Sequence, residues 1–384
     1  MSVYLDWAAT AIPYKEAIEE QTRVCSDFFG NPSSLHEPGR AARRLLDSCR
    51  SDIASMLSVR PEQLVFCSGA TEANNIALLS VLTRRKRGHV IVSAIEHSSG
   101  YEPALLLSSM GYDVDFIRPD ASGIISPVDI ANRVREDTVL VSVMLVNNET
   151  GAIQPVREIV QAVRTVQRRN IHVHCDVVQA SGKIAFNLTE LGVDSASISA
   201  HKFGGVRGAG IMFAARQWDV LIRGGGQEQA MRPGTENVAA VAAMRRALEI
   251  SEKEREKNSE HAIRLKKELI DGISNIKGAE FLPVEVTKKE KQYIPHILSV
   301  SFPPVPGEVL QRVLSDAGFY VSTGSACSSR ARRNSRVMDA MGISDRISFS
   351  AIRISTGYLT TEADITEFLR FIKREIPLLM KIAR

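Results

Sequence analysis

Short apolar segments alternate with amphipathic helical patterns over the first two thirds of the chain. Apolar runs of strand length occur at LVFC (64–67), HVIVSA (89–94), DVDFI (113–117), TVLVSVMLV (138–146), IHVHCDV (171–177) and AGIMFAA (209–215). Helical spacing of apolar residues predicts helices at 42–57, 70–83, 100–110, 127–135 and 155–169. This alternation is typical of an α/β fold in which helices cover both faces of a mostly parallel sheet. Ligands of such sheets bind beyond the carboxyl ends of the strands, so the loops there are the first candidates for a functional site.

The last third of the chain has a different pattern. A charged helical stretch at about 238–272 is followed by strand-like segments at 296–302, 319–323 and 351–356, by a helix at 307–317 and by a last helix from about 361. Strands and helices without regular alternation predict a second, smaller α+β domain.

Composition places the protein among ordinary globular proteins. Of its 384 residues, 44% are hydrophobic and 24% are charged. No stretch approaches the roughly 20 uninterrupted apolar residues of a membrane span, and MSVYLDWAAT lacks the order of a signal peptide. We therefore expect a cytoplasmic protein with no membrane partner. The net charge of +4 is too small to indicate a nucleic-acid partner, so no direct contact with DNA is expected.

The five cysteines do not form a recognisable framework. An odd count, wide spacing and the lack of a CxxC pair argue against disulfides or a zinc knuckle, and predict reduced thiols that are mostly buried. Cys327 differs, because it lies in GSACSSRARRNSRV (324–337) among small and polar residues, with four arginines after it. Such a segment would not pack a core, and we expect it to be mobile. Its arginines either keep the segment solvated or dock an acidic partner or a transfer RNA.

Two segments place residues that can bind a ligand or react with it directly after a predicted strand. In FCSGATEANNIALL (66–79), Ala70 and Thr71 would present free N–H groups at a helix N-terminus, which suits a phosphate; an ordinary capped helix start is an equal alternative. In SISAHKFGGVRGAGIMF (197–213), Lys202 stands at a strand end in a glycine-rich loop. Partial desolvation of its amine would suit Schiff-base chemistry, and a phosphate-binding or purely structural role is the alternative.

Three further strand ends carry polar side chains. IHVHCDVVQA (171–180) places His172, His174 and Asp176 on one strand face, and these residue types can form a metal site. We favour the alternative, in which Asp176 faces a cationic ring nitrogen and Gln179 lies near an oxygen. His97 in SAIEHSSG would cap a helix, stack on a planar ligand or move protons. Asn148 in LVNNETG would bind a ligand or serve only a turn. Pyridoxal phosphate uses all of these groups at once, so the combination predicts this cofactor.

These motifs together resemble the pyridoxal-phosphate cysteine desulfurases of the nitrogen-fixation and iron–sulfur-cluster type, within the class V aminotransferase family. The resemblance runs nearly end to end. It is carried by YLDWAAT (4–10), GNPSSLHEPGR (30–40), SGATEANN, VNNETG, SAHK, GGGQEQAMRPGTENVAA (224–240), STGSACSSR (322–330) and AIRISTG (351–357). Two departures stand out: Val206 and Arg207 replace the usual proline of the glycine-rich loop, and Trp7 stands where a small polar residue is usual.

The resemblance implies a fold, a domain division and a role for each motif. The fold would be the type I fold of pyridoxal-phosphate-dependent transferases, with a mostly parallel seven-stranded sheet in a large domain (16–255). A smaller α+β C-terminal domain (256–384) would include the N-terminal segment (1–15) and carry the cysteine loop (about 322–336). The implied catalytic residues are Lys202, which holds the cofactor, Cys327, which forms the persulfide, and His97, which also stacks on the ring. The other implied contacts are Asp176 with the pyridine nitrogen, Gln179 with the ring hydroxyl, Ala70, Thr71, Ser199 and His201 with the phosphate, Thr235 with the phosphate of the partner subunit in a homodimer, and Asn148 and Arg353 with the substrate carboxylate.

The implied activity is conversion of L-cysteine to L-alanine, with the sulfur passing to Cys327. From there it would pass to an acceptor protein for iron–sulfur cluster assembly or for thiolation of transfer RNA or a cofactor. A selenocysteine lyase or another class V enzyme is the closest alternative. A non-catalytic scaffold of a sulfur pathway and a metal-dependent hydrolase at His172, His174 and Asp176 are alternatives of other classes.

Overall fold

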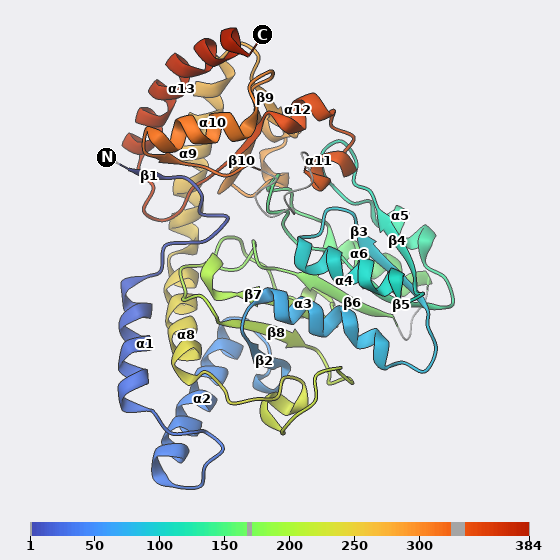
Figure 1. Cartoon of the computed structure of the whole chain (residues 1–384). Coiled ribbons are helices and arrows are strands. Elements are labelled where there is room, and N and C mark those ends of the chain that lie inside the picture. The colour runs from blue at the N-terminus through green and yellow to red at the C-terminus, as the bar shows by residue number, and fades with distance from the viewer. Residues whose placement is uncertain (1, 167–170, 324–334, 384) are drawn as a thin grey trace.

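The computed structural model describes residues 2–166, 171–323 and 335–383. Its largest element is a seven-stranded sheet with the strand order β2-β8-β7-β6-β5-β3-β4 (Figure 1). The strands are β2 (Leu64–Cys67), β3 (His89–Ser93), β4 (Asp113–Ile117), β5 (Thr138–Ser142), β6 (His172–Asp176), β7 (Ser195–Ser199) and β8 (Gly210–Ala214). Strand β8 runs antiparallel to the other six strands of this sheet. The predicted α/β fold with a mostly parallel seven-stranded sheet is confirmed.

Helices cover both faces of this sheet, and sheet and helices together form what we call the large lobe. They are α1 (Lys15–Asp27), α2 (Glu37–Met56), α3 (Ala70–Leu79), α4 (Ser98–Ser109), α5 (Pro127–Arg133), α6 (Val156–Val166), α7 (Leu188–Leu191) and α8 (Val238–Lys253). Side chains of β3 show how both faces are buried. Val90 and Val92 pack with residues of α3 and α4, whereas Ile91 packs in the cluster that includes α2, α6 and α8. Burial on both faces explains why these strands appear in the sequence as continuous apolar runs.

A three-stranded antiparallel sheet is the centre of a small lobe. Its order is β12-β10-β9, with β9 (Glu280–Leu282), β10 (Ile297–Ser301) and β12 (Ala351–Ser355). The small lobe also contains α9 (Arg255–Ser274), α10 (Gly307–Asp316), α11 (Arg336–Ala340), α12 (Asp345–Phe349) and α13 (Glu362–Ile382). Phe302 and Phe368 are fully buried in its core. The N-terminal strand β1 (Val3–Tyr4) pairs in parallel with β11 (Phe319–Tyr320), so the chain begins in this lobe and then crosses to α1 (Figure 1).

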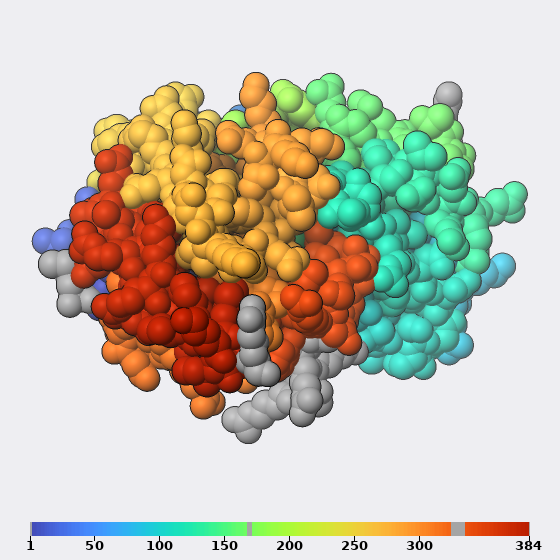
Figure 2. All heavy atoms as spheres, turned by 90° about the horizontal axis from the view of Figure 1, so that it is seen from above, coloured from blue at the N-terminus to red at the C-terminus, as the bar shows by residue number. Residues whose placement is uncertain are grey.

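The two lobes are in direct contact. Figure 2 shows the orange and red C-terminal residues seated against the teal part of the large lobe. At this boundary the guanidinium of Arg118 donates to the carbonyls of Asp339 and Ala340, and that of Arg336 donates to the carbonyl of Ala94. No helix among the described residues is long and apolar enough to cross a membrane.

Some predicted elements differ in detail from the structure. The charged stretch predicted as one helix at 238–272 is two helices, because the backbone of Glu254 (φ −94°, ψ 1°) leaves the helical conformation between α8 and α9. The predicted helix at 70–83 ends as an α-helix at Leu79 and continues as a 3₁₀ turn over Ser80–Thr83. Helix α1 lies in a segment for which the apolar pattern predicts no element.

Candidate active site

The loops after β3, β5, β6 and β7 and the N-terminus of α3 meet at one edge of the large sheet. The N-terminal crossing segment and β12 of the small lobe also reach this edge. Most of the predicted site residues therefore come together although they are far apart in sequence.

Lys202 lies in the short 3₁₀ turn that follows β7. Its Nζ donates to the carbonyl of Ala8 at 2.7 Å and to the carbonyl of Ala9 at 2.8 Å. Gln179 reaches the same place, since its Nε2 donates to the Ala8 carbonyl at 2.9 Å. Lys202 and Gln179 thus share one acceptor on the N-terminal crossing segment.

Asp176 ends β6 and is only 4% exposed. Its carboxylate accepts from the Val178 N–H at 2.9 Å through Oδ1 and from Asn74 Nδ2 at 2.9 Å through Oδ2. Asn74 belongs to α3, so two elements hold the carboxylate in place. Each oxygen keeps a further lone pair for a ligand.

His97 is both a helix cap and a neighbour of this carboxylate. Its Nδ1 accepts from the Ser99 N–H at 3.1 Å at the start of α4, and Ser99 Oγ lies 2.8 Å from Nδ1. Ser99 Oγ in turn accepts from Asn74 Nδ2 at 2.8 Å, so His97 and Asp176 are joined through one serine and one asparagine. Burial lowers the pKa of His97, and the nearby positive charge of Lys202 adds to this against the opposing effect of Asp176. The ring is therefore neutral at pH 7, and with Nδ1 accepting, the proton is on Nε2.

The N-terminus of α3 has the geometry of an anion site. Its N-cap is Gly69, which has no side chain to satisfy the first N–H groups, those of Ala70 and Thr71 among them. Gly69 has φ +155°, and a Cβ on Gly210 would stand 2.6 Å from the Gly69 Cα, so both positions require glycine. The alternative of an ordinary helix start with a side-chain cap is therefore wrong.

Ser199, the last residue of β7, borders this N-terminus, and His201 follows it in the next turn. A Cβ on Gly69 would lie 3.6 Å from Ser199 Oγ. His201 Nδ1 is 3.2 Å from Thr10 Oγ1, and burial lowers its pKa to about 4, so the ring is neutral at pH 7. Thr235 lies exposed in the loop before α8.

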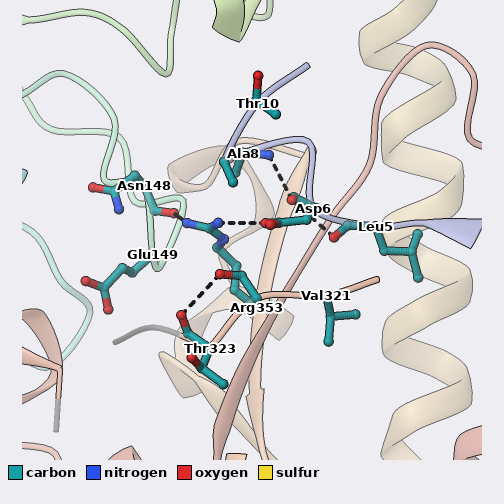
Figure 3. Close-up of polar contacts among 12 residues, drawn as sticks. Leu5, Asp6, Ala8, Thr10, Asn148, Glu149, Val321, Thr323 and Arg353 are labelled. Carbon is teal, nitrogen blue, oxygen red and sulfur yellow. Dashed lines mark hydrogen bonds and ion pairs between the residues drawn. The ribbon is translucent and has the colours of Figure 1, made fainter. Parts of the chain in front are cut away.

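Arg353, on β12, reaches the site from the small lobe (Figure 3). It is 6% exposed; its Nη1 donates to the Asn148 carbonyl at 2.8 Å, and its Nη2 pairs with Asp6 Oδ1 at 2.9 Å. Its Nε is buried and has no acceptor among the described residues. The predicted pair of Asn148 and Arg353 is in contact, but through the asparagine backbone. Asp6 was not anticipated as a site residue, although it stands within the YLDWAAT motif.

The histidines of β6 bond to the protein itself. His172 Nε2 and His174 Nδ1 both lie 2.7 Å from Ser195 Oγ, and His174 Nε2 lies 2.9 Å from Asn74 Oδ1. Burial lowers the pKa of His172 to about 4 and that of His174 to about 3. Within the described ranges no three His, Cys, Asp or Glu side chains are grouped to hold a metal ion.

Cys327 and three of the arginines after it (Arg330, Arg332, Arg333) lie outside the described residues. Arg336 is described, and it fixes the chain where the description resumes. Its guanidinium donates to the carbonyls of Ala94 and Glu96 and stacks on the Tyr101 ring, 3.7 Å from the centroid. The start of α11 is thus attached beside His97. Of the other cysteines, Cys49, Cys67 and Cys175 are buried thiols and Cys25 is exposed.

Some residues of the site were not singled out in the sequence. Asn74 and Ser99 connect His97 to Asp176, and Lys183 donates to Gln179 Oε1 at 2.8 Å. Asn74 could have been found from helical spacing, because it follows Ala70 by one turn of α3. Trp7, noted as a departure from the family pattern, lines a small cavity of about 40 Å³ beside Lys202, together with Lys183 and Tyr358.

The chain is similar to several known proteins along most of its length. Residues 3–368 match the family described as Aminotransferase class-V. The chain is 35% identical over 385 residues to "Cysteine desulfurase IscS" of Dictyoglomus turgidum, covering 99% of this chain and 96% of the relative. A solved "NifS-like protein" superposes with a TM-score of 0.90 at 37% identity, covering 98% of this chain and 100% of the other. "SspA in complex with cysteine" superposes with a TM-score of 0.81 at 28% identity, covering 94% and 100%. From the match over residues 3–368 and the extent of these similarities, the chain belongs to the class V aminotransferase family.

Proposed function

We propose that the protein is a pyridoxal-phosphate-dependent cysteine desulfurase, which converts L-cysteine to L-alanine and leaves the sulfur on Cys327. The observation that carries the proposal is the convergence of Lys202, Asp176, Arg353 and the α3 N-terminus at one sheet edge. The names of the relatives support the choice of substrate, since several are cysteine desulfurases and one solved structure is a complex with cysteine.

The residues present fit pyridoxal phosphate. The Lys202 amine would bind its aldehyde, and the buried Asp176 carboxylate, which has free lone pairs, would face its pyridinium nitrogen. The glycine-capped N-terminus of α3 would bind its phosphate. Gln179 would contact the ring hydroxyl, His97 the ring face, and Ala70, Thr71, Ser199 and His201 the phosphate. When bound, the cofactor supplies an electron sink for negative charge at the substrate carbon.

The substrate would be held by its carboxylate. Arg353 offers a planar fork whose Nε donor has no acceptor among the described residues, and its other contacts, to Asp6 and Asn148, fix the orientation of that fork. The Asn148 side chain would add a second contact. A carboxylate placed there lies between the two lobes, so the substrate would be oriented by both.

The chain's own residues would then carry the protons and the sulfur. The Lys202 amine removes and returns protons at the substrate carbon, while neutral His97 accepts or donates the thiol proton. The thiolate of Cys327 attacks the substrate sulfur, so that a sulfur–sulfur bond forms and the carbon–sulfur bond breaks. The electron pair of the broken bond stays on the carbon, which is protonated to give alanine. The outer sulfur of the persulfide would pass to an acceptor protein of cluster assembly or thiolation.

The test follows both products in one reaction. Purified protein is mixed with L-cysteine, and alanine and the mass of the Cys327 peptide are measured by mass spectrometry. We expect equal amounts of alanine and persulfide in the first turnover. Cys327→Ala should abolish persulfide and reduce alanine release by a hundredfold or more, since the thiolate is the sulfur acceptor.

Other outcomes would favour the alternatives. Unchanged turnover of cysteine or selenocysteine by Cys327→Ala would indicate a lyase that does not need the thiol. A purified protein without visible cofactor absorbance, and without activity after addition of pyridoxal phosphate, would contradict the enzyme proposal. Tightly bound metal in elemental analysis would point to the hydrolase alternative.

A further inference from the structure

Lys183 is a second buried lysine close to Lys202. It is 9% exposed and lies in the turn that follows β6. Within the part of the chain that the structure describes, the hydrogen-bond acceptor of its ammonium group is Gln179 Oε1, at 2.8 Å. Burial of an ammonium group is costly unless a hydrogen-bond partner compensates it. The partner here, Gln179, is itself a predicted contact of the cofactor.

A continuous path of hydrogen bonds joins the two lysines. Lys183 Nζ donates to Gln179 Oε1, Gln179 Nε2 donates to the Ala8 carbonyl, and that carbonyl also accepts from Lys202 Nζ. The distances along this path are 2.8, 2.9 and 2.7 Å. Each bond is within the normal range, so the path is well formed along its length.

Tight packing holds Lys183 at this place. Gly182, with φ +68°, has no Cβ, and one built there would stand 2.8 Å from both Phe203 Cβ and Ser251 Oγ. The turn therefore lies directly against the residue that follows Lys202. This packing fixes the backbone from which the Lys183 side chain reaches Gln179.

The charges around Lys183 are mostly positive. Burial and the charges of Lys202 and Arg353 lower the pKa of Lys183 to about 7. The titratable rings nearby, those of His201 and His296, have pKa values lowered by burial to about 4 and about 3 and are neutral at pH 7. A nearby carboxyl, that of Glu252, accepts from the Gly182 N–H, and burial raises its pKa.

We propose that Lys183 is a positioning residue, which fixes the amide of Gln179 so that its NH₂ group faces the cofactor ring oxygen and the Lys202 anchor. The inference rests on the proposed function. An amide has two chemically different ends of nearly equal shape, and Lys183 Nζ donates to the oxygen end, at 2.8 Å. With the oxygen held by Lys183, the NH₂ end is turned toward Ala8 and Lys202. Without Lys183 both orientations become accessible.

The test compares Lys183→Met with the parent holoenzyme. A donor at the ring oxygen, and positive charge nearby, both disfavour a proton on the nitrogen that joins Lys202 to the cofactor. We therefore expect the pH midpoint of the visible absorbance to rise by on the order of one pH unit in Lys183→Met. Lys183→Arg keeps a charged donor and should stay close to the parent midpoint. Gln179→Leu should raise the midpoint as Lys183→Met does.

Lys266→Met is the matched control. Lys266 is also buried, at 7% exposure, but it donates to the Ile294 carbonyl in the small lobe, away from this path. It should leave the midpoint unchanged and report only the cost of removing a buried lysine. Melting temperatures measured on all variants separate loss of fold from loss of position.

Three results would overturn the positioning role. The first is an unchanged midpoint in Lys183→Met, and the second is an equal rise in Lys266→Met. The third is a rise in the midpoint on Lys183→Met that is as large in the Gln179→Leu protein as in the parent. Gln179→Leu already breaks the path, so the positioning role predicts that Lys183→Met has less effect there. Failure of the parent protein to form a visible band would instead contradict the proposed function. If Lys183→Met does not fold, Lys183→Gln replaces it, because the new amide can still donate to Gln179. We expect this variant to fold and to show a smaller rise in the pH midpoint. An unchanged midpoint in Lys183→Gln would contradict the proposal.

Discussion

The guanidinium of Arg353 shows at the scale of one residue how the proposed site selects its substrate. Two of its three nitrogens are already occupied, by the Asn148 carbonyl and by Asp6, while Nε is buried and has no acceptor among the described residues. A buried donor without a partner is costly. A substrate carboxylate would relieve that cost, and we propose that the Arg353 Nε donor selects for an α-amino acid in this way.

Replacement of Arg353 by lysine tests this directly. Lysine keeps the charge but has neither the fork nor the Nε donor. Loss of a charge-assisted hydrogen bond of this kind corresponds to an increase in KM for L-cysteine of roughly 10- to 100-fold. Steady-state alanine formation measures it. Arg346→Lys, on the exposed face of α12, is the matched control and should leave KM unchanged. If cysteamine, which lacks the carboxylate, shows the same increase, Arg353 does not bind that group.

Single residues also show the limit of prediction from sequence. Lys202 and Asp176 could be placed because each stands at the carboxyl end of a predicted strand, and parallel strands bring those ends to one edge. Asp6 could not be paired with Arg353, since 347 residues separate them and no local pattern records the contact. Lys183 has no local feature that distinguishes it from a solvated lysine. Its burial is a result of tertiary packing around Gly182.

At the scale of elements, the N-terminus of α3 depends on backbone conformation. We expect Gly69→Ala to lose the cofactor more readily, because a Cβ is strongly disfavoured at φ +155° and the N–H groups of the first turn would be displaced. The dissociation constant of pyridoxal phosphate should increase by tenfold or more, measured by equilibrium dialysis. Gly342→Ala also places an alanine at a positive φ (+75°), with open space around it, and serves as the control for backbone strain. Equal cofactor loss in both variants would show that strain alone, and not the position at α3, is responsible.

The buried His174 of β6 should make the free energy of unfolding depend on pH. His174 has a pKa lowered to about 3 and stays neutral in the fold, while the same side chain in the unfolded chain takes up a proton below about pH 6.5. The free energy of unfolding therefore falls as the pH falls from about 6.5 toward 3. At pH 5 this one group accounts for about 2 kcal/mol.

His174→Gln should reduce that loss, since glutamine does not titrate and its amide can still donate to Asn74. The measurement is the melting temperature of each protein between pH 7 and pH 5, with the decrease expected to be smaller in the variant. His261→Gln, a half-buried position on α9, is the control. A decrease of the same size in the His174→Gln and parent proteins would mean that His174 is protonated in the folded state.

The strands of the large lobe could be predicted from sequence more fully than those of the small lobe. Both faces of the large sheet are buried, so β3, β5 and β8 appear as uninterrupted apolar runs. Strand β7 is less visible because Ser195, Ser197 and Ser199 alternate with its apolar residues, although all five side chains are buried. Strands β1, β9 and β11 are two or three residues long, and such short strands depend on their partners for stability. Their pairing is a long-range property that periodicity does not record.

At the scale of the whole molecule, the N-terminal crossing segment joins both lobes to the site. It pairs with β11 through β1, contacts Arg353 through Asp6, and supplies the Ala8 carbonyl to Lys202. Further along, the Ala11 N–H donates to the His201 carbonyl at 2.8 Å. A displacement of one lobe relative to the other would therefore change the contacts of Lys202 and Arg353 at the same time. We propose that the unit which binds the substrate is the whole chain, with its domains divided near residues 255 and 256.

The proposed homodimer extends this unit to two chains. Several large apolar side chains are exposed, among them Phe29 at 77% and Leu35 at 87% between α1 and α2, and Leu221 and Ile222 before α8. Exposed apolar side chains in such numbers favour an interface with another molecule. Thr235 is exposed in the same stretch that precedes α8, which suits a contact made with a partner's cofactor phosphate.

A mixture of two defective proteins tests whether Thr235 acts in trans. Lys202→Ala removes the cofactor anchor, and Thr235→Val removes the hydroxyl; each homodimer should be impaired. In a mixed dimer, the site that keeps Lys202 also receives an intact Thr235 from the other subunit, so one of its two sites is complete. Random exchange of subunits should then restore about a quarter of the parent activity, measured as alanine formed after joint refolding. If Thr235 acted within its own subunit, the site that keeps Lys202 would still lack the hydroxyl, and mixing would restore nothing. Size-exclusion chromatography with light scattering on the same mixture shows whether dimers formed, and dimers without restored activity would assign Thr235 to its own chain.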